Sequence, residues 1–358
     1  MSEKGFDPEK YLDAQKAAFN KALTRDSEKA TFIEFGGKPF SDHHAERVLP
    51  GYDSESKAEI LRETVKLAEV VMVVNALDVL HSPDGRTTRG RIRGDTQLFY
   101  DQETLRMVED AQKRQIPIEK VVMAVTPKEM TSENKRKVDK FRGDLGHRGV
   151  NLLLHKKITG YPSNVEMENI NPFEGNDLIR GKNKNLIAVS PGGGSGKFGV
   201  LLSEMYFALT TGEIPNYVKF ETFPIYQLDA NHALNLAFEA ASVDLKNKVV
   251  NISSKYSEQR TSYDKDLENF ELLKKVFEVF GKSEDITHMK DAVDMGINQI
   301  VTGITDMDKV IQACYKEICQ RIIRYQTEVD VGIEKEETVK NAQDILGRFQ
   351  QIYKINIP

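Results

Sequence analysis

The first two-thirds of the chain alternate short apolar runs with amphipathic stretches. The apolar runs are rich in Val, Ile and Leu, as is typical of strands that are buried on both faces of a sheet. They predict strands at residues 30–36, 70–80, 120–126, 151–158, 185–190 and 218–225. Apolar residues recur at helical spacing at 9–23, 56–69, 102–114, 132–145 and 198–209. This alternation predicts an α/β fold with a mostly parallel sheet and helices on both of its faces.

The pattern changes after about residue 245. Three stripes of apolar residues at helical spacing follow, and no convincing strand separates them. The stripes are Leu267, Phe270, Leu273, Phe277 and Phe280, then Ile311, Cys314, Ile318, Ile322 and Tyr325, then Val339, Ala342, Leu346, Phe349 and Tyr353. We therefore expect two domains, an α/β domain over 1–245 and a helical domain over 246–358, as the length of 358 residues allows.

Composition and charge narrow the class of protein. Hydrophobic residues make up 39% and charged residues 29%, which excludes disordered and collagen-like chains. The formal net charge of −5 argues against general nucleic-acid binding. Polar residues interrupt the longest apolar run, 70–80, and no secretion signal begins the chain, so we expect no membrane association. The two cysteines, Cys314 and Cys319, form no disulfide framework and fit a cytoplasmic location.

Residues 191–197 carry the most specific chemical signal. They read Pro-Gly-Gly-Gly-Ser-Gly-Lys and join the expected strand 185–190 to the expected helix 198–209. A strand, a glycine-rich loop and a helix together present backbone N–H groups to an anion at the helix N-terminus, and Lys197 adds positive charge. The alternative is a tight turn with no ligand. The residues expected to hold a phosphate are Ser190, Gly192, Gly193, Gly194, Ser195, Gly196 and Lys197.

An anion site makes three structural predictions. The N–H groups of Gly193 to Lys197 should not be bonded to neighbouring carbonyls. Phe198 should turn into the helix–sheet interface, because an aromatic ring gains more from burial than from facing a phosphate. The strand that carries Glu221 should run beside the strand that ends at Ser190.

Two nucleotide motifs compete for this loop. Aligned as a P-loop, Gly196 and Lys197 match the terminal Gly-Lys, but Phe198 replaces the hydroxyl residue that holds Mg²⁺. This alignment favours a P-loop-like site for ATP or another nucleotide, with Mg²⁺ as a candidate cofactor. Aligned as a dinucleotide fingerprint, Gly194, Gly196 and Gly199 fit G-x-G-x-x-G, and Glu221 could bind a ribose. NAD(P) is therefore the alternative cofactor.

Other candidate residues follow the expected strands. Glu221 shares a strand face with Lys219 and could act as metal ligand or base, or form a salt bridge with that lysine. Asp78 lies near the end of the run 70–80, and the basic segment after it contains Arg93 and Asp95, which form either a substrate clamp or a solvated loop.

His232 opens a helical stretch beyond this strand. Asn235 and Glu239 follow it at helical spacing, so the three side chains should line one face. Capping and surface polarity are the alternative explanation for them. We expect His43, His44 and His155 to be structural.

Several segments together resemble a bacterial family of unknown function, number eighteen forty-six of the domain-of-unknown-function series. They are residues 35–40, 47–51, 160–162, 191–197, 219–225, 235–241 and 294–298. The resemblance implies an α/β phosphate-loop domain followed by helices, and no established reaction. Family members usually continue into a further C-terminal α/β region, so the chain resembles a shortened member. It also departs from the family at Ala233, where relatives usually have proline.

Three functional hypotheses result. The first is a nucleotide- or phosphate-binding group-transfer enzyme that acts on a small phosphate-containing molecule. In it, Glu221, His232 and Arg93 have catalytic roles, and Asp78, Asp95, Asn235 and Glu239 are substrate candidates. The second is an NAD(P)-dependent oxidoreductase. The third is a non-catalytic ligand-binding or assembly protein, possible as a homo-oligomer because the segment 263–280 is rich in apolar surface.

Overall fold

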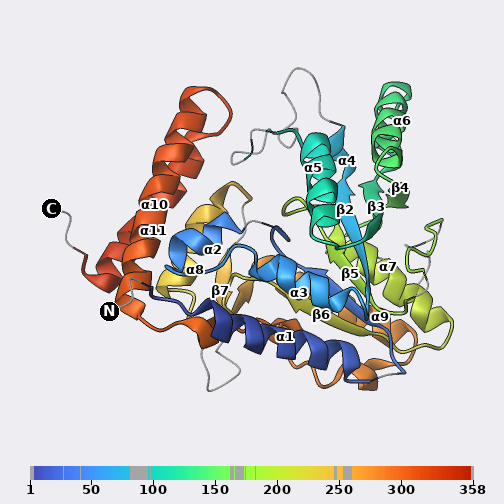
Figure 1. The fold of residues 1–358 in the computed structure, drawn as a ribbon, viewed down its shortest axis with the longest axis horizontal. Coiled ribbons are helices and arrows are strands. Elements are labelled where there is room, and N and C mark those ends of the chain that lie inside the picture. The colour runs from blue at the N-terminus through green and yellow to red at the C-terminus, as the bar shows by residue number, and fades with distance from the viewer. Residues whose placement is uncertain are drawn as a thin grey trace.

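The fold is built on one parallel sheet, shown in Figure 1. The structure is a computed structural model that describes residues 4–26, 28–40, 42–80, 96, 98–161, 165, 173, 175–181, 183–245, 248–252 and 260–355. The sheet has six strands in the order β4-β3-β2-β5-β1-β6, and every neighbouring pair is parallel. The strands are β1 (Thr31–Phe35), β2 (Glu69–Asn75), β3 (Ile118–Val125), β4 (Asn151–Lys156), β5 (Leu186–Val189) and β6 (Asn216–Phe220). The predicted α/β class and parallel sheet are confirmed.

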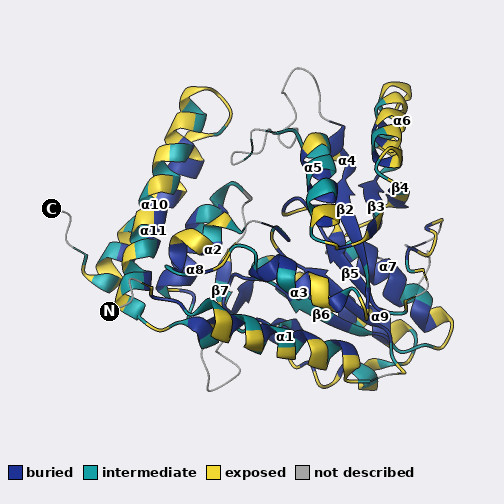
Figure 2. Ribbon diagram, viewed as in Figure 1, coloured by how far each residue is buried: buried dark blue, intermediate teal, exposed yellow. Residues whose placement is uncertain are grey.

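Helices cover both faces of this sheet. On one face lie α1 (Pro8–Thr24), α3 (Ser56–Thr64), α5 (Tyr100–Lys113) and α6 (Ser132–Gly146), whose apolar residues share a core with Ile33, Met72 and Val121. On the other face lie α7 (Lys197–Thr210) and α9 (Asp264–Val279), which share a second core with Phe32 and Val71. Alternate residues of one strand thus enter opposite cores, because successive side chains of a strand point to opposite faces. Figure 2 shows the central strands as mostly buried, and β1 and β5 are buried at every residue.

A third core lies beside the sheet. It is formed by α2 (His43–Val48), α8 (Ala233–Ala241), α10 (Met307–Asp330) and α11 (Glu336–Tyr353), together with Phe6 and Tyr11. Figure 1 shows α10 and α11 side by side as a long helical pair. The short helices are α4 (Ala76–Val79) and the 3-10 turns Pro127–Glu129, Val243–Leu245, Ser283–Ile286, Ala292–Met295 and Ile300–Gly303.

Three expectations about strands need correction. A two-stranded antiparallel sheet, β7 (Val249–Asn251) and β8 (Thr261–Tyr263), follows residue 245, where we expected no strand. The expected strand 70–80 ends at Asn75, because its side chain accepts a hydrogen bond from Leu77 N at 3.1 Å and caps α4. The expected strand 218–225 ends at Phe220, because Asn298 binds the carbonyls of the next two residues at 2.5 and 2.9 Å.

Within the described part of the chain, no helix combines the length and apolar character needed to cross a membrane.

Candidate functional site

The strand order creates a reversal point between β1 and β5. The chain leaves β1 toward α3 on one face of the sheet, and it leaves β5 into α7 on the opposite face. Open α/β sheets bind ligands in the crevice at such a point, outside the carboxyl ends of the strands. Here that edge holds Gly36 and Gly37 after β1 and the loop 190–196 after β5.

The loop after β5 keeps its backbone donors available. Gly194 and Gly196 have φ of +74° and +97°, a left-handed region that favours glycine. A Cβ on Gly196 would also lie 3.0 Å from Ala124 Cβ. Among the described residues, no backbone N–H from Gly192 to Lys197 donates a hydrogen bond to a backbone carbonyl outside the helix. These amides precede a helix N-terminus, where the helix dipole favours an anion.

Two side chains accompany these amides. Ser195 is only 4% exposed, and its Oγ has no hydrogen-bond partner in the structure, which is costly for a buried hydroxyl. Lys197 Nζ is buried, donates to Ser190 Oγ at 2.9 Å and lies 4.0 Å from Glu34 Oε1. Burial lowers the pKa of Lys197, although the nearby carboxylates oppose the shift.

Phe198 packs into the helix–sheet interface, as expected. Its ring is 4% exposed and meets the Tyr217 ring edge-on, with the centroids 5.5 Å apart. The first turn of α7 therefore offers no hydroxyl at this position. Tyr217 in turn donates a hydrogen bond to Glu34 Oε2 at 2.7 Å. Sequence reasoning missed Glu34, although a charged residue inside the otherwise apolar run 32–35 was an available signal.

A buried ionic cluster lies on the same face at β6. Lys219 Nζ contacts both carboxylate oxygens of Asp266 at 2.6 and 2.7 Å, and Glu221 Oε1 at 3.1 Å. The expected pairing of Lys219 with Glu221 is therefore present, but Asp266 from α9 was not foreseen. Burial raises the pKa of Glu221 to about 7, and the neighbouring Asp266 carboxylate adds to the rise while Lys219 opposes it. Near neutral pH, Glu221 can therefore either accept or donate a proton.

Glu221 reaches the crevice across the end of β1. Gly36 N donates to the Phe220 carbonyl at 2.5 Å, and a Cβ on Gly36 would collide with the Glu221 side chain. Glycine is required there by this close approach. The expectation that the strand of Glu221 runs beside the strand ending at Ser190 was wrong, because β1 lies between β5 and β6.

A small cavity of about 30 Å³ adjoins Glu221, which is room for roughly two water molecules. Its polar lining comes from Lys219, Glu221, Tyr226, Thr261, Ser262 and Asp266. Asn298 supports this region through its bonds to the carbonyls of Glu221 and Thr222. This gives a structural role to the sequence segment 294–298. In the described residues, no group of three or more His, Cys, Asp or Glu side chains is placed to hold a metal ion.

The remaining candidates come from the sequence after β2 and from α8. Arg93 and Asp95 are outside the described residues, and Asp78 is buried in α4. His232 caps α8, with Nδ1 accepting from Leu234 N at 3.4 Å, and burial lowers its pKa.

Asn235 and Glu239 do not meet His232 at one pocket. The Asn235 amide accepts from Ile225 N at 2.8 Å and donates to the Asp229 carbonyl at 3.0 Å, so it holds the turn before α8. Glu239 pairs with Arg348 of α11 at 3.2 Å. Each of these three side chains is engaged with a different neighbour, and a shared role toward a substrate stays a prediction.

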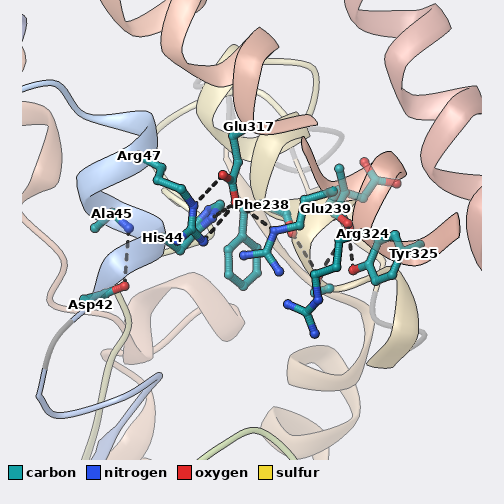
Figure 3. Close-up of polar contacts among 12 residues, drawn as sticks. Asp42, His44, Ala45, Arg47, Phe238, Glu239, Glu317, Arg324 and Tyr325 are labelled. Carbon is teal, nitrogen blue, oxygen red and sulfur yellow. Dashed lines mark hydrogen bonds and ion pairs between the residues drawn. The ribbon is translucent and has the colours of Figure 1, made fainter. Parts of the chain in front are cut away.

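A second polar cluster, shown in Figure 3, connects α2 to α10. Glu317 is almost completely buried and contacts His44 Nδ1 at 3.1 Å, Arg47 Nε at 2.5 Å and Arg321 Nε at 2.7 Å. The His44 ring also meets Phe223 edge-on, and burial lowers its pKa. These contacts hold α2 against α10, in agreement with the structural role expected of His44.

Asp42 continues this connection toward the site. Its side chain caps α2 by accepting from Ala45 N, and its Oδ2 contacts Lys57 Nζ at 2.7 Å and Thr222 Oγ1 at 3.0 Å. Lys57 Nζ also donates to the Gly36 carbonyl at 3.2 Å. The crevice at β1 and the α2–α10 contact are thus joined by one chain of polar groups.

The fold and the loop define an α/β protein with a parallel sheet, whose carboxyl edge carries a glycine-rich loop with unbonded amides and, beside it, buried charges. The family model described as "Domain of unknown function DUF1846, N-terminal" matches residues 4–350, and the chain belongs to this family. The family named from the sequence motifs is therefore confirmed. The expectation of a shortened member is corrected for the domain that the matching model describes: it is the N-terminal domain, and the match extends over residues 4–350.

Curated relatives agree with this assignment. The chain is 33% identical over 348 residues to a UPF0371 protein of Clostridium botulinum (strain Alaska E43 / Type E3), covering 96% of this chain and 65% of the relative. It is 35% identical over 344 residues to a UPF0371 protein of Streptococcus pneumoniae serotype 2 (strain D39 / NCTC 7466), covering 94% of this chain and 65% of the relative. The chain thus spans about 65% of the length of these relatives.

Proposed function

We propose that the protein is a phosphate-binding group-transfer enzyme whose ligand, a nucleotide or another small phosphate-containing molecule, is held by a P-loop-like strand–loop–helix unit. The observation that carries the proposal is the Ser195 hydroxyl, which is buried without a partner beside backbone amides that make no bonds to neighbouring carbonyls. A phosphate oxygen would accept hydrogen bonds from these donors. Lys197 Nζ would contribute the positive charge.

Glu221 supplies the proton chemistry in this proposal. Its pKa of about 7 suits a general acid or base at neutral pH. Lys219 holds one of its oxygens at 3.1 Å and so orients the carboxyl group. A ligand that is anchored at the loop would reach Glu221 across Gly36, where no side chain intervenes.

Two observations favour phosphate binding over NAD(P) binding. A Cβ on Gly199 would lie 3.7 Å from Ile158 Cδ1, an ordinary contact, so the third glycine of the dinucleotide fingerprint is not required by packing. Glu221 is also separated from β5 by the whole of β1. A second candidate is ligand binding without turnover, which the replacement of the Mg²⁺-binding hydroxyl by the buried Phe198 favours.

The test compares matched serine variants. Ser195→Ala removes the unpartnered hydroxyl at the loop, whereas Ser203→Ala removes a buried, unpartnered hydroxyl inside α7, the helix that follows the loop. Binding of inorganic phosphate, ATP with and without Mg²⁺, and NADP is measured by isothermal titration calorimetry. We expect Ser195→Ala to weaken phosphate binding about tenfold, because a hydrogen bond to a charged group contributes roughly 1.5–3 kcal/mol. Ser203→Ala should bind as the wild type does.

Lys197→Ala extends the same test to the charge at the loop. We expect it to abolish the thermal stabilisation that a bound ligand gives. If none of these compounds binds the wild type at millimolar concentration, or if both serine variants bind equally well, the proposal is refuted.

A further inference from the structure

Charged side chains at the carboxyl edge of the sheet are paired. Among the described residues that contact one another there, Lys57 pairs with Asp42 and Lys197 lies near Glu34. Lys219 is shared between two carboxylates, those of Glu221 and Asp266. Three lysines thus face four carboxylates. Beyond the loop itself, these contacting residues of the described part of the chain carry no excess of positive charge.

The carboxylates lie where the remainder of an anchored ligand must pass. Glu34 approaches Lys197 Nζ at 4.0 Å from the β1 side, and Glu221 covers Gly36 at the end of β1. Ionised carboxylates accept hydrogen bonds and repel further negative charge. Glu221, with a pKa of about 7, is in this form in only part of the molecules at neutral pH. Hydroxyl groups would satisfy them, whereas a second or third phosphate would not.

We propose that the ligand is a monophosphate ester of a polyhydroxyl compound, an inference that rests on the proposed function. Its phosphate binds the loop 192–197, and one of its hydroxyl groups donates a hydrogen bond to Glu221. Two observations support this class of ligand over a polyphosphate. The described lysines beside the loop are paired with carboxylates, and Gly36 has no side chain to separate the loop from Glu221. Sugar phosphates and nucleoside monophosphates share this chemistry. A polyphosphate nucleotide has it too, but it adds negative charge beside Lys57, Lys197 and Lys219, each of which already lies within 4.0 Å of a carboxylate.

The experiment is a calorimetric series on the full chain, with and without Mg²⁺. The ligands are inorganic phosphate, ribose 5-phosphate, AMP, ADP and ATP. We expect ribose 5-phosphate to bind at least about tenfold more tightly than inorganic phosphate, as one added charge-assisted hydrogen bond allows. Affinity should not rise from AMP to ATP. Glu221→Gln should remove the advantage of ribose 5-phosphate over inorganic phosphate, and the exposed control Glu271→Gln should keep it.

The outcomes separate this inference from the proposed function. Affinity that rises with each added phosphate from AMP to ATP overturns the inference, as do equal affinities of ribose 5-phosphate and inorganic phosphate in the wild type. In both cases, phosphate binding that depends on Ser195 leaves the proposed function standing. If no compound in the series binds, inorganic phosphate included, both proposals fail. Ribose 5-phosphate and AMP, compared directly, show whether the sugar alone or a nucleoside is preferred.

Discussion

His155 on β4 provides a quantitative test of the burial seen in the structure. The residue is 3% exposed, and its Nε2 is buried with no hydrogen-bond partner in the structure. Burial lowers the pKa of the imidazole from 6.5 to about 4. The folded protein therefore binds fewer protons than the unfolded chain between these two values. The free energy of unfolding therefore keeps its full value with respect to His155 above pH 6.5. It falls as the pH falls toward 4, because the unfolded chain gains a proton that the folded protein does not bind.

The size of the effect follows from the shift. Between pH 7.5 and pH 5, linkage predicts that His155 alone removes about 2 kcal/mol from the free energy of unfolding. His155→Leu abolishes this titration and replaces an unpartnered ring nitrogen with an apolar side chain. Other histidines titrate in both proteins, so their contributions cancel in the difference. The variant should therefore lose about 2 kcal/mol less than the wild type over this pH interval.

The assay is urea unfolding followed by circular dichroism at several pH values from 7.5 to 5. Leu153→Met is the control, since it alters a residue on the same face of β4 and changes no titrating group. It should keep the pH dependence of the wild type. If His155→Leu also keeps that dependence within about 0.5 kcal/mol, which is about the limit of additivity, the ring is not buried as the structure shows.

Three further predictions concern the polar clusters around Glu317 and Lys219 and the close approach of Gly36 to Glu221. Glu317→Ala should lower the free energy of unfolding by about 3 kcal/mol, because it removes a buried carboxylate that joins α2 to α10 and leaves the largely buried Arg321 without its partner; a loss below about 1 kcal/mol in urea unfolding would contradict this. Asp266→Asn should lower the pKa of Glu221 below about 7, since it removes a nearby negative charge; NMR titration of labelled carboxyl groups measures it, and an unchanged or raised value would count against the cluster. Gly36→Ala should cost about 1–3 kcal/mol through overpacking against Glu221, whereas Gly347→Ala, with open space around it in α11, should be stabilising by roughly 0.5–1 kcal/mol; equal effects would show that the close approach is absent.

Local patterns sufficed to predict most of the sheet and its helices. The strands 30–36, 120–126 and 185–190 were found within two residues at each end, because buried parallel strands are continuous apolar runs that a sequence displays directly. The loop at Ser195 was found for a similar reason, since its glycines and lysine are adjacent in the chain. The short strands β7 and β8 were missed because three residues are too few to show a period.

The partners of these residues could not be predicted in the same way. Asp266 meets Lys219 only because α9 packs on the face of the sheet that α7 also covers, and nothing near Asp266 in the sequence marks that contact. His232 could not be assigned from the sequence for a different reason. A polar residue at a helix start fits both catalysis and capping, and the structure shows it capping α8.

The order of the strands explains why the loop and its surroundings form one site. Because β5 is inserted between β1 and β2, its loop lies between residues that are distant in the chain. From the β2 side, Asn75 Nδ2 donates to the Gly194 carbonyl at 3.1 Å, and Lys157 Nζ secures the other end of that amide at 2.9 Å. From the β1 side, Glu34 faces Lys197. A loop held on both sides through a carbonyl and its lysine leaves its N–H groups without backbone partners, and the proposed anion site depends on these free donors.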